Sequence, residues 1–230
     1  MSTNAVPESI SVVVWDAPIR LFHWALAVLI LLQYGTAEWH WLDMQWHVRF
    51  GYATLALLVF RVAWGFFGSQ TARFADFVHG PRRVCGYVRA VVAGHAPPTS
   101  FGHNPLGGWS VLAMLASLLV QTITGLFASN HRHTVFGPWA ARVSDIWSQR
   151  LTDIHKINQN VLLFLIALHV AAILAYWIGR GENLVAPMLH GRKTVDSRPA
   201  LRFASTGQAL AALAFAILLV WLIVIAGERV

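Results

Sequence analysis

Charged residues are scarce in this chain of 230 residues, of which they make up 12%. Soluble domains carry about 25%. Hydrophobic residues make up 57%, and the mean hydropathy is +0.55. This shortage of charge excludes an ordinary soluble domain and indicates a small membrane protein. The 17 Lys and Arg exceed the 10 Asp and Glu. In a membrane protein such an excess usually belongs to cytoplasmic loops, so we expect lipid and no nucleic acid as a partner.

Cysteine is nearly absent as well. Cys85 is the single cysteine, which excludes an internal disulfide bond. The sequence also has no C-x-x-C-H motif, the signature of covalently attached c-type haem. The first eleven residues, MSTNAVPESIS, lack a basic segment followed by an apolar one, so we expect no cleaved signal peptide.

Long apolar runs are what the sequence does have, and five of them are long enough to span a bilayer. They lie at 21–37, 48–67, 107–128, 157–178 and 204–226. The fifth has no histidine and no charge, which favours a packing or anchoring helix. We therefore predict an all-α integral membrane protein with a four-helix bundle and a fifth, C-terminal transmembrane helix. Its predicted parts are an N-terminal segment 1–20, the bundle 21–178, a basic loop 179–203, and the fifth helix with a short tail, 204–230.

The connecting segments differ in their content of positive charge. Two of them together hold nine cations: Arg73, Arg82, Arg83, Arg89, Arg180, Arg192, Lys193, Arg198 and Arg202. The segments on the opposite side hold four: Arg132, Arg142, Arg150 and Lys156. This asymmetry predicts a cytoplasmic N-terminus, a cytoplasmic loop at 179–203 and a C-terminus on the other side. Within the connections, GPRRVCGYVRAVVAG predicts a short amphipathic helix on the inner membrane surface, and 139–152 a similar one outside.

Four of the eleven histidines lie in or at the edge of the apolar runs, where polar side chains are costly and usually functional. They are His23, His47, His155 and His169. The last two are 14 residues apart, about 40° short of four helical turns, and so share one helix face. At 1.5 Å per residue they are about 21 Å apart along the axis. One helix thus presents an imidazole near each side of the membrane.

The predicted topology sorts these histidines into two layers, His23 with His169 on the inner side and His47 with His155 on the outer side. A bare zinc or copper site usually needs three or four protein ligands, which neither layer offers. Haem iron needs only axial ligands, because the porphyrin supplies the other four. The pattern therefore favours two b haems, each with two axial histidines, and hence an electron path across the membrane.

Basic residues near these histidines suit the anionic haem propionates. Arg20, Arg49 and Lys156 lie close to them in sequence, and Arg61 is near the inner end of the second span. Arg61 could equally extend to the inner interface. Three glycines, Gly51, Gly65 and Gly125, allow either a flat macrocycle or another helix to approach closely. Two further histidines, His40 and His103, are rival ligands, or contacts for a propionate or a quinone headgroup.

Four segments resemble the bacterial di-haem cytochrome b561 and nickel–iron-hydrogenase-type cytochrome b family. They are VVVWDAPIRLFHW, QWHVRFGY, GHNPLGGWSVLAML and DIHKINQNVLLFLIALHV, and the resemblance covers about 12–195. It implies a four-helix core with two b haems in the bacterial inner membrane. The ligands it implies are again His23, His47, His155 and His169. Such proteins exchange electrons between the quinone pool and a periplasmic or membrane-bound redox partner, such as a c-type cytochrome, a dehydrogenase or a hydrogenase. The fifth span is a departure, since many relatives stop after four.

Two alternative functions stay open at the level of sequence. A stand-alone superoxide oxidase coupled to quinone would need a basic funnel at the outer face, for which Arg132, Arg142 and Arg150 are candidates. A transporter would use the histidines without haem. No side chain has the pattern of a nucleophile or a general base, so an electron-transfer subunit is favoured over an enzyme that acts alone.

Overall fold

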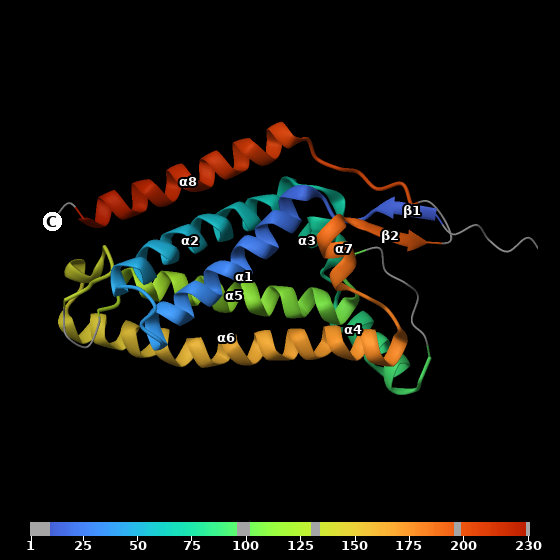
Figure 1. The fold of residues 1–230 in the computed structure, drawn as a ribbon, viewed down its shortest axis with the longest axis horizontal. Helices are drawn as coiled ribbons and strands as arrows, with labels where there is room; N and C mark the ends of the chain where they lie inside the picture. Colours follow the sequence, from blue (N-terminus) through green and yellow to red (C-terminus); the bar gives the residue numbers. More distant parts are fainter. Residues whose placement is uncertain (1–9, 96–101, 130–133, 196–198, 229–230) are drawn as a thin grey trace, which may run out of the picture.

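Five long helices dominate the computed structural model, which describes residues 10–95, 102–129, 134–195 and 199–228. These helices are α1 (Ala17–Glu38), α2 (Met44–Phe67), α5 (Pro105–Phe127), α6 (Asp145–Arg180) and α8 (Thr206–Glu228) (Figure 1). By length and composition each can cross a membrane. The five predicted spans and the helical fold class are therefore confirmed.

The shorter elements connect these helices. They are η1 (Gln70–Ala72), α3 (Phe74–Phe77), α4 (Pro81–Val92), η2 (Ala140–Arg142), α7 (Val185–His190) and the strands β1 (Ile10–Val13) and β2 (Arg192–Val195). The strands pair antiparallel, with Ile10 opposite Val195 and Val13 opposite Arg192. The N-terminal segment and the basic loop, predicted as separate connections, are thus joined in a small two-stranded sheet.

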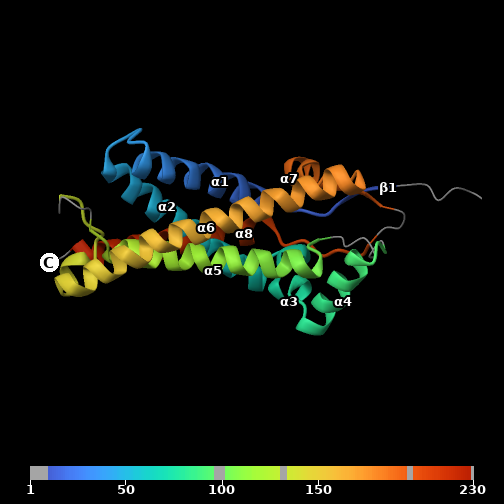
Figure 2. The same cartoon turned by 90° about the horizontal axis from the view of Figure 1, so that it is seen from below.

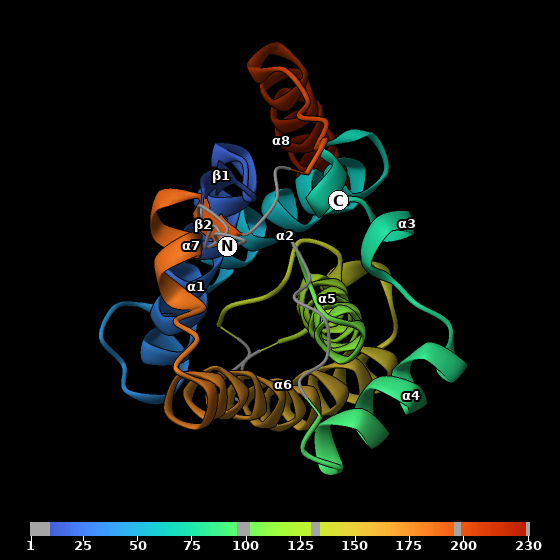
Figure 3. The ribbon, with the colours of Figure 1, turned by 90° about the vertical axis from the view of Figure 1, so that its right-hand side faces the viewer.

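The long helices are arranged as two antiparallel pairs with a fifth helix outside. Helix α1 packs on α2, α5 packs on α6, and the pairs meet through α2 and α5. Seen along the bundle, α1, α2, α5 and α6 surround a common axis (Figure 3). Helix α8 packs on α2 outside this ring through small side chains, Ala209 and Ala216. Seen from below, α6 lies alongside α5 over much of its length (Figure 2).

Polar caps followed by proline begin two of the spanning helices. The side chain of Asp16 accepts a hydrogen bond from the Ile19 backbone N–H at 2.9 Å, and Asn104 accepts one from Gly107 at 2.7 Å. Proline stands in the first turn of both helices, where its missing N–H is not needed. At its other end, α6 stops at Gly181, whose φ of 66° is a left-handed conformation that glycine adopts without strain.

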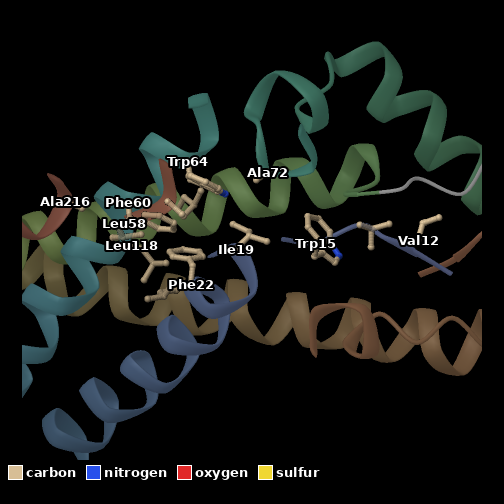
Figure 4. Close-up of a cluster of buried hydrophobic side chains, with 14 residues drawn as sticks. Val12, Trp15, Ile19, Phe22, Leu58, Phe60, Trp64, Ala72, Leu118 and Ala216 are labelled. Atoms are coloured by element: carbon tan, nitrogen blue, oxygen red, sulfur yellow. The ribbon is translucent and has the colours of Figure 1, made fainter. Parts of the chain in front are cut away.

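The buried core runs from β1 along α1 and α2 and also takes in side chains of α5, α6 and α8 (Figure 4). Leu58 is fully buried and Trp64 is 1% exposed, and the rings of Phe60 and Trp64 stack at 5.7 Å. Trp64 also donates its indole N–H to the second carboxylate oxygen of Asp16, at 2.9 Å. One buried carboxylate therefore both caps α1 and holds α2 against it.

The predicted surface helix at 139–152 is wrong in extent. Only Ala140–Arg142 form a short 3-10 turn, and α6 already begins at Asp145. The extra turns are anchored on the end of α5, because Ser148 donates to the Phe127 carbonyl and Thr152 accepts from the Ser129 N–H. The helix therefore starts well before the apolar run that marks its membrane-crossing part.

The predicted amphipathic helix near residues 81–94 is confirmed as α4. None of its residues is buried, and Val88, Val91 and Val92 are exposed large hydrophobic residues. The hydroxyl of Tyr87 bonds to that of Tyr176 on α6. Its location on the membrane surface stays a prediction that this exposed apolar side supports.

Replacing Asp16 tests the junction between α1 and α2. We expect Asp16→Ala to lower the free energy of unfolding by about 2–4 kcal/mol, because it removes a helix cap and leaves the buried Trp64 N–H unpaired. Thermal unfolding of the detergent-solubilised protein, followed by circular dichroism, measures the loss. Asp43→Ala is the matched control, since Asp43 precedes α2 but makes no side-chain capping bond. Equal effects of the two substitutions would contradict the role given to Asp16.

Candidate functional site

The four membrane histidines meet in two pairs, each formed across the bundle. The ring centroids of His23 on α1 and His169 on α6 are 6.4 Å apart. Those of His47 on α2 and His155 on α6 are 6.1 Å apart. Helix α6 is continuous from residue 155 to residue 169, so the pairs lie about 21 Å apart along its axis. The pairing is the one that the sequence predicts.

The spacing within each pair fits two axial imidazoles on one iron. A metal–imidazole bond is about 2 Å long, and the ring centroid lies roughly 1 Å behind the nitrogen, so two ligands on opposite sides of a metal have centroids about 6 Å apart. Both observed spacings agree with this value. Among the described residues, no three His, Cys, Asp or Glu side chains are grouped to hold a bare metal ion. Each pair therefore suits a cofactor that brings its own equatorial ligands.

Hydrogen bonds fix the tautomer of the His47–His155 pair. The Nδ1 atom of His47 lies 3.0 Å from the Gln33 carbonyl, and that of His155 lies 2.9 Å from the Gln121 carbonyl. A carbonyl oxygen only accepts, so both Nδ1 atoms carry the proton and both Nε2 atoms keep a free lone pair. Metal-binding histidines typically donate their other ring N–H in this way.

Two Gln–Thr clamps supply these acceptors, Gln33 with Thr36 on α1 and Gln121 with Thr124 on α5. In each clamp the threonine hydroxyl lies within hydrogen-bond distance of the glutamine carbonyl, at 2.9 Å and 3.1 Å, and shares its proton with the nearer carbonyl of Leu32 or Val120. Each glutamine side chain also bonds the helix that carries the histidine. Gln33 donates to Thr54 on α2, and Gln121 accepts from Asn158 on α6. The clamps were not predicted from the sequence, although a polar glutamine inside an apolar run is a signal that could have indicated them.

The His23–His169 pair has a different surrounding. The Nδ1 atom of His23 is buried and has no hydrogen-bond partner among the described residues. The ring of His23 instead meets the edge of Trp24 at 5.0 Å. His23 therefore lacks the contact with a backbone carbonyl that both His47 and His155 make.

Arg61 and His103 lie near this second pair. Arg61 is 2% exposed, and its guanidinium lies 5.0 Å from the Phe74 ring centroid and 5.8 Å from that of Phe77. His103 packs against Phe77 at 4.8 Å and Trp15 at 4.9 Å. Each has a buried nitrogen without a partner in the described part of the chain. Two unsatisfied donors or acceptors at one place are costly unless a bound group meets them.

Electrostatics keep His103 neutral. Burial, followed by the charges of Arg61, His169 and His23, lowers the pKa of His103 to about 3. At pH 7 it therefore offers one N–H donor and one lone pair. Arg61, in contrast to His103, keeps its charge. Its side chain is buried, so it does not extend to the membrane interface, which was the alternative for this residue.

In the described part of the chain, the remaining candidates for propionate or haem binding make no contact with either histidine pair that identifies their role. Arg20 donates to the Leu189 carbonyl, while its Nε is buried and unpartnered among the residues described. Arg49 lies over the Trp46 ring at 4.9 Å, and Lys156 is exposed next to His155. His40, the rival ligand, is exposed and its Nδ1 lies 3.2 Å from the Glu38 carbonyl. Arg20, Arg49 and Lys156 thus stay candidates for propionate binding.

Three glycines have separate explanations in the structure. A Cβ on Gly125 would lie 3.1 Å from Cε1 of His155, so this glycine makes room for the imidazole. A Cβ on Gly65 would fall inside the Phe74 ring, which identifies Gly65 as a packing residue. Gly51 has open space, with the Gln33 side chain 3.8 Å away. A close approach by a macrocycle is therefore feasible at Gly51 and not at Gly65.

Two of the arginines proposed for a basic funnel make contacts with other groups in the described structure. Arg142 donates to the Ala226 carbonyl and lies over the Trp139 ring, and Arg150 lies over the Trp147 ring. Arg132 lies outside the described residues. A groove of about 630 Å³ also lies elsewhere. It is almost entirely apolar, is lined by residues of α1, α2 and α8, and includes none of the paired histidines.

Comparisons with known proteins identify the family of the chain. Residues 14–191 match the family model described as prokaryotic cytochrome b561. The chain is 25% identical to a protein named "Probable Ni/Fe-hydrogenase B-type cytochrome subunit" from Rhizobium leguminosarum bv. viciae, over 83% of this chain and 92% of that one. Proteins of the same name from Azotobacter chroococcum mcd 1 and Azotobacter vinelandii are 27% and 26% identical, each over 84% of this chain and 93% of theirs.

Enlarging Gly125 tests the placement of His155. We expect Gly125→Ala to lower the haem content of the purified protein, because the added methyl group must displace the imidazole by a few tenths of an ångström. Absorbance of the haem relative to protein measures the loss. Gly179→Ala is the control on the same helix as His155, with nothing within 4 Å of the new Cβ. Unchanged haem binding in Gly125→Ala would argue against His155 as a ligand.

Proposed function

Because the chain belongs to the prokaryotic cytochrome b561 family, and is thus a multi-pass membrane b-type cytochrome of electron transport, we propose that it carries electrons across the bacterial inner membrane. The exchange runs between the quinone pool and a redox partner at the other side. The observation that carries this proposal is the two histidine pairs, whose α6 members His155 and His169 are about four helical turns apart.

We assign one b haem to each pair, with His23 and His169 as ligands of one and His47 and His155 as ligands of the other. Each bound haem supplies an iron that is reversibly reduced by one electron. The chain holds the imidazoles in place, fixes the proton of His47 and His155 on Nδ1, and excludes water with its apolar helices. No catalytic residue is required for this role.

Basic side chains near each pair are proposed to bind the haem propionates. Arg20 and Arg61 lie towards the His23–His169 end, while Arg49 and Lys156 are neighbours in sequence of His47 and His155. The unpartnered buried nitrogens of Arg61 and His103 support an oxygen ligand there, a propionate or a quinone headgroup. Arginine suits a carboxylate because its donors form a planar fork.

The redox partner is proposed by analogy with the relatives. Their names describe cytochrome subunits of nickel–iron hydrogenases. We therefore propose a membrane-bound or periplasmic redox enzyme subunit, such as a hydrogenase or dehydrogenase, or a c-type cytochrome. The excess of Lys and Arg in the connections at the β1–β2 end supports a cytoplasmic N-terminus. In the proposed orientation His47 and His155 lie near the periplasm, together with the C-terminus.

Histidine substitutions combined with haem quantification test this function. Purified protein should show the α-band of b haem after reduction with dithionite, and pyridine haemochrome analysis should give two haems per chain. His155→Ala and His169→Ala should each lose about one haem, because each removes a ligand of a different site. A soluble quinol analogue should reduce the b haem of the native chain.

His40→Ala is the control, because His40 is exposed and belongs to neither pair. It should keep both haems. Folded protein without an α-band would overturn the proposal and favour a histidine-lined transporter. Retention of both haems in both ligand variants would overturn the assignment of the ligands.

A further inference from the structure

Helix α4 lies crosswise to the long helices, at the end of the bundle where β1 and β2 pair (Figure 1). Seen along the bundle, it runs outside the ring, next to α5 and α6 (Figure 3). A helix that crosses the bundle axis lies roughly in the plane of a membrane that the bundle spans. One of its long sides then faces the lipid and the opposite side faces the water.

Two contacts hold α4 in this position. Just before the helix, the indole N–H of Trp109 on α5 donates to the His79 carbonyl at 2.8 Å. Within the helix, the hydroxyl of Tyr87 bonds to that of Tyr176 on α6, which also accepts from Asn104 at 2.8 Å. The level of α4 along the bundle is therefore fixed by α5 and α6.

The Tyr176 contact places α4 at the boundary of the hydrocarbon layer. Tyr176 stands near the end of the apolar run 157–178, and its neighbours Trp177 and Ile178 are 54% and 84% exposed. Just beyond them, Arg180 lies over the Tyr176 ring at 5.2 Å. Exposed aromatic residues followed by a cation are typical of the interface between acyl chains and headgroups. A helix bonded to Tyr176 lies at this interface as well.

The side chains of α4 separate by chemistry around the helix. Three half-buried residues mark the side that faces the bundle, namely Val84, Tyr87 and Ala90. At about 100° per residue, a quarter turn from that side in one direction is the centre of three exposed valines, Val88, Val91 and Val92. A quarter turn in the other direction is the centre of Arg82, Arg83 and Gly86. The apolar and the basic side are thus opposite each other.

The polar side carries charge of one sign. Helix α4 contains Arg82, Arg83 and Arg89 and no Asp or Glu. In the described part of the chain no carboxylate forms an ion pair with any of these three arginines. An anionic membrane surface attracts such cations by roughly fivefold in binding per arginine. At the level of the headgroups, an anionic phospholipid is the partner that offers acyl chains to one side of a helix and phosphates to the other.

We propose that α4 is a docking surface for anionic phospholipids. Its exposed valines lie against the acyl chains, its three arginines bind the phosphates, and the bond between Tyr87 and Tyr176 holds it at that depth. In the orientation proposed above, these lipids belong to the cytoplasmic leaflet. The inference goes beyond the proposed function, because the surface includes none of the paired histidines.

Spin labels on α4 test this docking in the complete purified protein, reconstituted in nanodiscs of phosphatidylcholine and phosphatidylglycerol in equal parts. Cys85 is the single cysteine and is exposed, so Cys85→Ser gives a background for one label at a time. We expect the Val88→Cys label to collide more with oxygen, which dissolves in lipid, than with a water-soluble nickel chelate.

The matched control is Gly86→Cys, on the opposite side of α4, where an added Cβ has nothing within 4 Å. Its label should show the reverse preference, for the nickel chelate over oxygen. A Val88→Cys label that prefers the nickel chelate, or equal behaviour of the two labels, would overturn the docking.

Removing charge tests the selectivity for anionic lipid. Replacing Arg82, Arg83 and Arg89 by glutamine should lower the ratio of immersed to water-exposed Val88→Cys label by roughly fivefold for each arginine lost. Nanodiscs of phosphatidylcholine alone should lower the ratio for the native arginines as well. Arg150→Gln is the control at the start of α6, where it should leave the ratio unchanged. The same immersion in both lipid mixtures, with and without the arginines, would contradict the role given to the phosphates.

A further substitution tests the bond that sets the depth. Tyr87→Phe removes one hydroxyl of the contact with Tyr176, so a label on the native Cys85 should become more mobile, with a narrower spectrum, while the haem content stays the same. Tyr34→Phe, on α1 and away from α4, is the control. A Cys85 label that is equally immobile in Tyr87→Phe and in the native chain would remove the role given to this bond.

Discussion

A polar atom buried in an apolar bundle must have a partner, and the rest of this site depends on that constraint. An imidazole has two nitrogens to satisfy. At His47 and His155 one nitrogen is satisfied by a helix carbonyl. The other is then left as a lone pair, and the ring centroids of the two histidines are 6.1 Å apart. The iron of a b haem, proposed above for this pair, would meet both lone pairs at once.

The same arrangement is repeated in the two helix pairs. In each pair, one helix carries a Gln–Thr clamp and the next carries the histidine that donates to it. The clamp on α1 accepts from His47 on α2, and the clamp on α5 accepts from His155 on α6. Helix α6 departs from the repeat because it also carries His169, which faces α1. Its additional early turns, held on the end of α5 by Ser148 and Thr152, fix the depth at which both of its histidines lie.

The sequence was sufficient for features that follow from helix periodicity and charge. The five spans and the two histidine pairs could be predicted because hydrophobic runs and a separation of 14 residues determine which side chains share a face. The start of α6, the β1–β2 pairing and the clamps could not, since they depend on contacts between segments distant in sequence. Gly65 illustrates the limit: only the position of Phe74 shows that this glycine packs against a ring and leaves no room for a cofactor.

The fifth helix gains a structural role from its contacts. It lies beyond residues 14–191, which match the family, and its sequence indicated only packing or anchoring. Near its C-terminal end the carbonyls of Ile223 and Ala226 accept bonds from Trp139 and Arg142. Gly227 permits this close approach, because a Cβ there would lie 2.6 Å from the Pro138 carbonyl oxygen. Helix α8 thereby holds the segment that leads into α6, and so it stabilises the start of the helix that carries two of the four histidines.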